Sequence, residues 1–214
     1  MAHLLIHRGL AKKKFKENTL SAFKYCFKKK FGIETDLHVT KDNKLICFHD
    51  FNLKRKFKTN KLIKNTNFKE INKIGKKFKY YIPELKELIH ISRNRNYLML
   101  EIKSLFSRQN LLDLIKQTKK LKFFSITSFK EKNIKNIYGL KKNLKLGLCF
   151  SSVTPVEKII KKSKLSYVKI LVMEKKFLTE KKLDKIKKPK YYYTAKNKII
   201  RKKYYNKNLI FENL

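Results

Sequence analysis

Residues 32–50 read GIETDLHVTKDNKLICFHD, two apolar runs joined by a short polar segment. The runs at 33–39 and 45–49 have the composition of β-strands, and only residues 39–44 connect them. Two parallel strands need a crossover of about a dozen residues, so this connection is too short for a parallel pair. The stretch therefore predicts an antiparallel hairpin that turns near Asp42 and Asn43, where asparagine tolerates the backbone of a tight turn.

Strand-like and helical segments alternate along the chain on both sides of this hairpin. Asn18 or Thr19 is expected to cap the first helix, and residues 51–82 have the weakest pattern, typical of a loop with a short helix. Further strands are expected at 3–7, 97–102, 123–127, 145–150, 167–172, 190–194 and 208–211, and helices at 17–30, 83–92, 107–120, 130–138, 154–163, 179–187 and 197–205.

The number of strands favours a closed barrel. Alternation of strand and helix indicates a parallel sheet or barrel, and eight parallel strands remain once the returning strand of the hairpin is set aside. We therefore predict an α/β fold, a minimal (β/α)8 TIM barrel with a small hairpin after the second strand. Such barrels take about 250 residues and can be as short as about 200, so residues 1–214 are expected to form a single domain.

Ionisable residues gather where the predicted strands end. Residues two apart on a strand face the same way, which places Glu34 with Asp36 and Glu101 with Lys103. A hairpin that pairs residue 41 with residue 44 would also place His49 opposite Asp36. In TIM barrels the chemistry takes place at the carboxyl ends of the strands, so these side chains are candidates for an active site.

The chemical types of these residues indicate a phosphate ester as substrate. Three carboxylates on neighbouring strands repel one another unless a cation lies among them, and oxygen ligands without cysteine favour Mg²⁺ or Ca²⁺. Arg8 and Lys103 supply positive charge for an anion, and arginine suits phosphate. His7 and His49 titrate near neutrality, with an ordinary pKa of about 6.5. Together they predict metal-assisted cleavage of a phosphate ester.

The net charge of the chain is extreme, with 56 basic against 16 acidic residues, or +40. Such a charge favours nucleic acid or an anionic membrane surface as a partner. However, only six of the basic residues are arginines, the better readers of phosphate and guanine, and the 50 lysines are spread along the chain. We therefore expect no specific nucleic-acid partner and at most a weak association with an anionic membrane surface.

The cysteines point to a reducing compartment. Cys26, Cys47 and Cys149 lie far apart in apolar segments, which predicts buried free thiols and neither a metal pair nor a disulfide framework. Too few apolar residues precede His7 for a signal peptide, and no apolar run reaches the roughly 18 residues of a membrane span. The expected location is the cytoplasm.

Six short motifs resemble, in order and in approximate spacing, those of the glycerophosphodiester phosphodiesterase family. They are HRG at 7–9, ENT at 17–19, ETDLHVTKD at 34–42, HD at 49–50, IPEL at 82–85 and EIKS at 101–104. Each motif alone is weak, but the six in order are specific. Residues 3–104 carry nearly all of the resemblance, and fainter echoes follow at 125–129, 190–197 and 209–214.

The resemblance implies a TIM barrel that binds one divalent cation, Mg²⁺ or Ca²⁺, and hydrolyses glycerophosphodiesters to sn-glycerol 3-phosphate and an alcohol. By analogy with the related phosphatidylinositol phospholipases C, the glycerol 2-hydroxyl would attack phosphorus and water would open the cyclic product. Matched residue by residue, Glu34, Asp36 and Glu101 resemble the metal ligands, His7 and His49 the general acid/base pair, and Arg8 and Lys103 the phosphate-binding cations.

The last part of the chain departs from the family pattern. The family has Trp-Thr-x-Asn near the seventh strand, whereas this chain has Tyr193-Thr194-Ala195-Lys196. The last strand of the family ends in Thr-Asp and a helix follows, whereas here the sequence is Phe211-Glu212-Asn213-Leu214. These departures concern substrate choice and barrel stability more than the reaction itself.

Two other functions are compatible with the sequence. One is a non-enzymatic polyanion binder, in which 50 lysines bind nucleic acid or anionic lipid with a steep salt dependence. The other is a phospholipase of the lyso- or D-type on the same barrel. Release of choline or ethanolamine without activity on intact lipid would exclude it.

Overall fold

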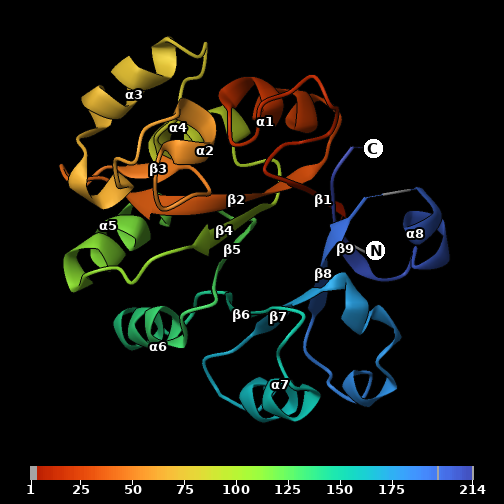
Figure 1. Cartoon of the computed structure of the whole chain (residues 1–214). Coiled ribbons are helices and arrows are strands. Elements are labelled where there is room, and N and C mark those ends of the chain that lie inside the picture. The colour runs from red at the N-terminus through yellow and green to blue at the C-terminus, as the bar shows by residue number, and fades with distance from the viewer. Residues whose placement is uncertain (1–3, 197, 214) are drawn as a thin grey trace.

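Strands and helices alternate in the predicted order in the computed structural model, which describes residues 4–196 and 198–213 (Figure 1). The strands are β1 (Leu4–His7), β2 (Gly32–Val39), β3 (Leu45–Cys47), β4 (Leu98–Ile102), β5 (Phe124–Ser128), β6 (Leu146–Phe150), β7 (Ile170–Glu174), β8 (Lys190–Ala195) and β9 (Asn208–Phe211). The α-helices are α1 (Leu20–Lys28), α2 (Lys54–Phe57), α3 (Phe68–Lys76), α4 (Leu85–Ser92), α5 (Arg108–Thr118), α6 (Glu131–Leu140), α7 (Val156–Ser163) and α8 (Lys198–Lys203), and the 3₁₀ helices are η1 (Ile63–Asn65), η2 (Lys175–Thr179) and η3 (Lys181–Leu183).

Eight parallel strands form a closed ring. Their order is β1-β9-β8-β7-β6-β5-β4-β2, and the parallel pairing of β1 with β2 closes it. Strand β3 lies outside the ring, antiparallel to β2, and the helices lie around the barrel (Figure 1). The prediction of a (β/α)8 barrel with a hairpin after the second strand is confirmed.

The hairpin between β2 and β3 has a different turn from the expected one. Thr40 N donates to Lys44 O at 3.0 Å, so three residues form the loop. The third of them, Asn43, has φ of 57°, which gives a common three-residue hairpin loop with a left-handed last residue. The predicted register, with residue 41 opposite residue 44, is therefore wrong by one position.

Two segments hold more, or different, structure than the sequence indicates. In the stretch 179–187 only the short η3 forms in place of the expected α-helix, because Glu180 has an extended backbone and its carboxylate accepts from Lys182 N. The stretch 51–82 contains η1 and the helices α2 and α3. With the β3 strand it packs around its own small core, whose buried members are Ile46, Phe48, Leu53, Phe57, Ile63, Ile71, Tyr80 and Ile82.

The interior of the barrel is filled by side chains up to the level of the carboxyl ends. Leu5 in β1, Met99 in β4, Tyr191 in β8 and Ile210 in β9 belong to one buried cluster. Because every second residue of a strand points inward, the next inward position on each of these strands lies at the mouth of the barrel. Those positions are His7, Glu101, Tyr193 and Glu212.

The three cysteines are buried, as expected from their apolar surroundings in the sequence. Cys26, Cys47 and Cys149 are buried free thiols. Burial raises the pKa of Cys26 and of Cys47 to about 12, so both stay protonated and unreactive. Among the helices described, none has the length and apolar character that crossing a membrane requires.

Candidate active site

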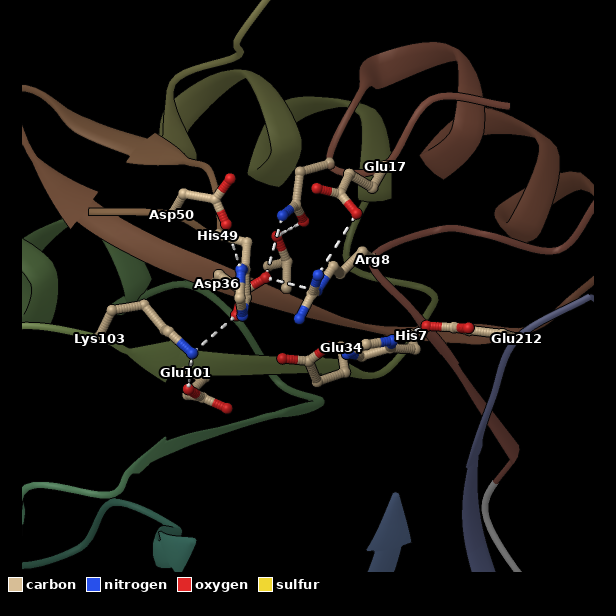
Figure 2. A network of polar contacts seen from close by, with 12 residues as sticks. His7, Arg8, Glu17, Glu34, Asp36, His49, Asp50, Glu101, Lys103 and Glu212 are labelled. Atoms are coloured by element: carbon tan, nitrogen blue, oxygen red, sulfur yellow. Dashed lines mark hydrogen bonds and ion pairs between the residues drawn. The ribbon is translucent and has the colours of Figure 1, made fainter. Parts of the chain in front are cut away.

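All seven residues singled out from the sequence line one cavity of about 160 Å³ at the carboxyl end of the barrel. They come from segments far apart in the chain and meet because the strands are neighbours. Figure 2 shows their polar side chains converging. The seven are His7, Arg8, Glu34, Asp36, His49, Glu101 and Lys103.

Three carboxylates lie close together in the lining of the cavity. Asp36 in β2 lies opposite Glu101 in β4, and oxygen atoms of these two residues and of Glu34 all lie within 4.8 Å of one another. Burial, together with the charges of Asp36 and Glu101, raises the pKa of Glu34 well above its ordinary value. Within the described residues Glu34 Oε2 is buried and accepts no hydrogen bond. An oxygen cluster with an unsatisfied buried atom fits a divalent cation.

Two cations flank the carboxylates. Arg8 Nε lies 3.0 Å from Asp36 Oδ2 as an ion pair, and Lys103 Nζ lies 3.4 Å from Asp36 Oδ1 and 2.8 Å from Glu101 Oε1. Burial alone would raise the pKa of Asp36, but Arg8 and Lys103 outweigh it and hold that pKa below its usual value. The site thus keeps Asp36 ionised and presents two positive groups to an anion in the cavity.

Asn18, which with Thr19 was one of two candidate caps for the first helix, is a buried residue that contacts the site. Its Nδ2 donates to Asp36 Oδ2 at 3.0 Å, and its Oδ1 accepts from Thr35 Oγ1 at 2.7 Å. The N-cap position of α1 is occupied by Thr19, whose hydroxyl donates to Lys16 O and makes no cap bond. The ENT motif at 17–19 marks Asn18 in the sequence. The motif alone does not show that the Asn18 amide points toward Asp36.

His49 reaches the cavity although the hairpin register differs from the prediction. Phe48 N donates to Asp36 O at 3.0 Å, so Phe48 and not His49 is the residue opposite Asp36. The His49 ring is held by Asp50, with 2.7 Å between Nδ1 and Oδ1, and the backbone oxygen of His49 lies 3.1 Å from Nε2 of the buried His38. Burial lowers the pKa of His49, and Asp36 partly offsets this.

His7 is held in the same way by a residue from the far end of the chain. Its Nδ1 lies 2.5 Å from Glu212 Oε1, and its Nε2 lies 3.8 Å from Glu34 Oε2. The hydrogen bond from His7 lowers the pKa of Glu212, although burial opposes this. In the sequence, Glu212 stands out only as a departure from the family pattern.

A chain of ion pairs connects Arg8 with Asp50, the residue that holds His49. Arg55 in α2 binds Glu17 through Nη2 and Asp50 through Nε, the latter at 2.6 Å. The other oxygen of Glu17, Oε2, lies 3.3 Å from Arg8 Nη1. Lys56 Nζ lies 3.1 Å from Glu17 Oε1, the oxygen that also binds Arg55. Arg55 lies in a segment without a clear pattern, so no motif points to it.

Aromatic side chains form another wall of the cavity. Tyr193 donates its hydroxyl to Phe150 O at 3.0 Å, and its ring meets Phe129 edge-on with 6.4 Å between centroids. Tyr193 and Phe129 both line the cavity. Tyr193 is the residue at which the resemblance implied tryptophan, so an aromatic wall is kept.

Comparison with known proteins agrees with the motifs. The model of the glycerophosphoryl diester phosphodiesterase family matches residues 7–202. A glycerophosphodiester phosphodiesterase of Caldanaerobacter subterraneus subsp. tengcongensis is 29% identical over 161 residues, which is 69% of this chain and 66% of that protein. One from Bacillus altitudinis is 30% identical over 110 residues, 48% of this chain and 44% of that protein. The matches thus span just under two thirds and under half of these relatives' lengths.

Solved structures share the fold at low identity. A glycerophosphodiester phosphodiesterase from Thermotoga maritima superposes with a TM-score of 0.83 at 22% identity, covering 99% of this chain and 94% of the other. A phosphodiesterase from Oleispira antarctica, solved in complex with the product sn-glycerol-3-phosphate, gives 0.83 at 19% identity, covering 98% and 92%. With the family model matched over most of its length, this chain belongs to the glycerophosphoryl diester phosphodiesterase family.

Proposed function

We propose that this protein hydrolyses glycerophosphodiesters to sn-glycerol 3-phosphate and an alcohol. The observation that carries the proposal is the single cavity lined by three carboxylates, two cations and two histidines. The family membership and the names of the curated relatives support the same reaction.

In this proposal one divalent cation, Mg²⁺ or Ca²⁺, is held by Glu34, Asp36 and Glu101. The unsatisfied buried Glu34 Oε2 and the short distances among the three carboxylates support this ligand set. When bound, such an ion polarises phosphoryl oxygens and stabilises the negative charge that develops on them. Arg8 and Lys103 bind the non-bridging oxygens of the phosphate, which arginine and lysine do well.

His7 and His49 serve as the acid/base pair. A carboxylate can only accept, so Glu212 and Asp50 each hold a proton on Nδ1 of their histidine and leave Nε2 for the substrate. One histidine takes the proton of the attacking hydroxyl, and the other, protonated, gives its proton to the oxygen of the leaving alcohol. Each group is expected to contribute about 10²–10⁴-fold to the rate.

The test measures release of glycerol 3-phosphate from glycerophosphocholine and glycerophosphoethanolamine with Mg²⁺, with Ca²⁺ and with EDTA. We expect metal-dependent release that falls by about 10²–10⁴-fold in His7→Ala and is also lost in Glu34→Ala. His90→Ala is the control, because His90 is exposed on α4 and outside the cavity.

Other outcomes of this experiment contradict the proposal. Absence of release with either metal would show that the cavity serves another phosphodiester or binding alone. With a lysophospholipid added to the substrates tested, release of choline or ethanolamine from it, without activity on the glycerophosphodiesters, would instead show a phospholipase of the D-type.

The partner and location proposals are coarser. The three buried free thiols support a reducing compartment, the cytoplasm. The 50 lysines among 56 basic residues support a weak, salt-sensitive association with an anionic membrane surface and no specific nucleic-acid partner.

A further inference from the structure

Two residues that depart from the family pattern, Lys196 and Glu212, meet beside His7. Glu212 Oε1 lies 2.5 Å from His7 Nδ1, and Glu212 Oε2 lies 3.9 Å from Lys196 Nζ. Figure 2 shows the Glu212 carboxylate beside the His7 ring, on the side away from the carboxylate cluster. The two departures therefore lie together, next to a residue of the proposed acid/base pair.

The backbone holds Glu212 firmly in this place. Ile6 pairs with Phe211 across the parallel strands β1 and β9, so the residues that follow them, His7 and Glu212, come side by side. Glu212 N donates to Ala195 O at 2.9 Å. Its carboxylate is largely buried, with 17% of the side chain exposed, so the contact with His7 is shielded from water.

We propose that Glu212 is a positioning residue for His7: its carboxylate holds the Nδ1–H tautomer and turns Nε2 toward the carboxylate cluster. The 3.8 Å between His7 Nε2 and Glu34 Oε2 shows that this nitrogen points to the cavity. With the other tautomer, Nδ1 would be unprotonated and two electron pairs would face each other at 2.5 Å. Fixing a tautomer through the second ring nitrogen is how such partners act on histidine elsewhere.

Lys196 has a smaller part in this arrangement. It is 65% exposed and 3.9 Å from Glu212, and an exposed pair of this kind contributes little. We expect Lys196→Ala to leave the His7 tautomer unchanged and to change the turnover number less than twofold. The hydrogen bond between Glu212 and His7, and not the ion pair, is what the experiment must test.

The first measurement is ¹⁵N NMR of protein labelled at histidine, recorded at pH 8.0. The signal of His7 is assigned by its loss in His7→Gln. We expect a protonated Nδ1 in the wild type and in Glu212→Gln, which keeps an acceptor oxygen, and a shift toward protonated Nε2 in Glu212→Leu and Glu212→Ala. A protonated Nδ1 in folded Glu212→Leu or Glu212→Ala would overturn the proposal.

The second measurement is kinetic and rests on the proposed hydrolysis. Glu212→Leu should lower kcat by about 10–100-fold, as loss of an outer-shell partner does, with KM changed less than twofold and with partial recovery in Glu212→Gln. The control is Glu157→Leu, which removes an exposed carboxylate of α7 that pairs with Lys182. An unchanged kcat in Glu212→Leu would contradict the positioning role, whereas an inactive wild type with the expected tautomer would contradict only the proposed reaction.

Discussion

Asn18 shows how one buried side chain can organise the site. It donates to Asp36 and accepts from Thr35, and it is completely buried. Its φ of 53° lies in the left-handed region that asparagine adopts more readily than most residues. One side chain thus satisfies a proposed metal ligand and supplies the backbone conformation that the loop before α1 needs.

Asn18→Ala should therefore weaken both the fold and the metal site. Removing one hydrogen bond to the buried carboxylate of Asp36 and one from the buried hydroxyl of Thr35 is expected to lower the free energy of unfolding by about 1–3 kcal/mol. The Mg²⁺ concentration that gives half-maximal activity should rise by about 10–100-fold, as for other outer-shell partners. Thermal unfolding and an activity titration with Mg²⁺ measure the two effects.

The matched control is Asn43→Ala. Asn43 has nearly the same backbone, with φ of 57°, but lies in the hairpin loop outside the cavity. It therefore reports the cost of alanine in the left-handed region by itself. An equal rise of the Mg²⁺ requirement in both variants would show that Asn18 acts on the backbone and not on Asp36.

At the residue scale, the sequence revealed which side chains carry charge at the strand ends, but not which residues support them. Asn18 and Glu212 contact partners 18 and 205 positions away. Local preference made Asn18 or Thr19 a candidate helix cap, and the contact of Asn18 with Asp36 forms only once β2 lies beside the first loop. Glu212 could be connected with His7 only after the barrel had closed.

At the element scale, helix α2 is tied to the rest of the site through Arg55. Its guanidinium binds Glu17, from the loop before α1, and Asp50, which follows the hairpin and holds His49. Burial alone would raise the pKa of Glu17 and of Asp50, but bonds led by those from Arg55 outweigh it and hold both below their usual values. The bridge therefore needs both carboxylates ionised.

Arg55→Met should lower stability at neutral pH but not in acid. Carboxyls with depressed pKa values stabilise the fold fully above their unfolded pKa of about 4, and this is lost as the pH falls through the folded values. Because the Arg55 side chain is 48% exposed, we expect a loss of only about 1–2 kcal/mol at pH 7. Urea unfolding of wild type and variant from pH 7 to pH 3 should show the difference shrinking.

Lys61→Met is the control for this series. Lys61 forms an ion pair with Glu70, in which both side chains are largely exposed, and such a pair contributes about 0–1 kcal/mol. A loss in Arg55→Met that is no larger than in Lys61→Met, or that persists unchanged at pH 3, would contradict the bridging role.

The sequence predicted elements well where hydrophobic periodicity decides them. The strands of the ring are short apolar runs that can pack only in a sheet, and the short connection at 39–44 settled the antiparallel hairpin. The hairpin register was missed because two- and three-residue loops suit the same sequence. Only one short helix was expected in 51–82, where α2, η1 and α3 form, because the apolar residues of this stretch face a small separate core that forms only once β3 is in place.

At the scale of the whole molecule, the candidate active site differs in charge from its surroundings. The chain carries +40, while the cavity concentrates carboxylates that are matched by Arg8 and Lys103. The carboxylates in the cavity act at short range, on a ligand already bound there. The charge of the lysine-rich surface acts at longer range, on a ligand that is still approaching. A long-range field affects how fast a charged ligand arrives more than how tightly it is held.

The surface charge predicts weak membrane binding that depends on anionic lipid. Vesicles of phosphatidylcholine alone should not retain the protein in a sedimentation assay. Vesicles that also contain phosphatidylglycerol should retain it at low salt and release it at about 0.5 M salt, where the screening length is below about 10 Å. Equal retention by both kinds of vesicle would show that charge is not what holds the protein at the lipid surface.

The same charge predicts how substrates of different net charge respond to salt. Glycerophosphocholine is zwitterionic with no net charge, whereas glycerophosphoglycerol carries one negative charge. The field of a chain with +40 should therefore speed the encounter of the second substrate only. From about 10 mM to 500 mM salt we expect kcat/KM for glycerophosphoglycerol to fall by about tenfold, with little change for glycerophosphocholine. In the proposed reaction both compounds enter the same cavity. A parallel decline for both would therefore assign the salt effect to the site, and two flat profiles would show that the lysines do not steer substrate.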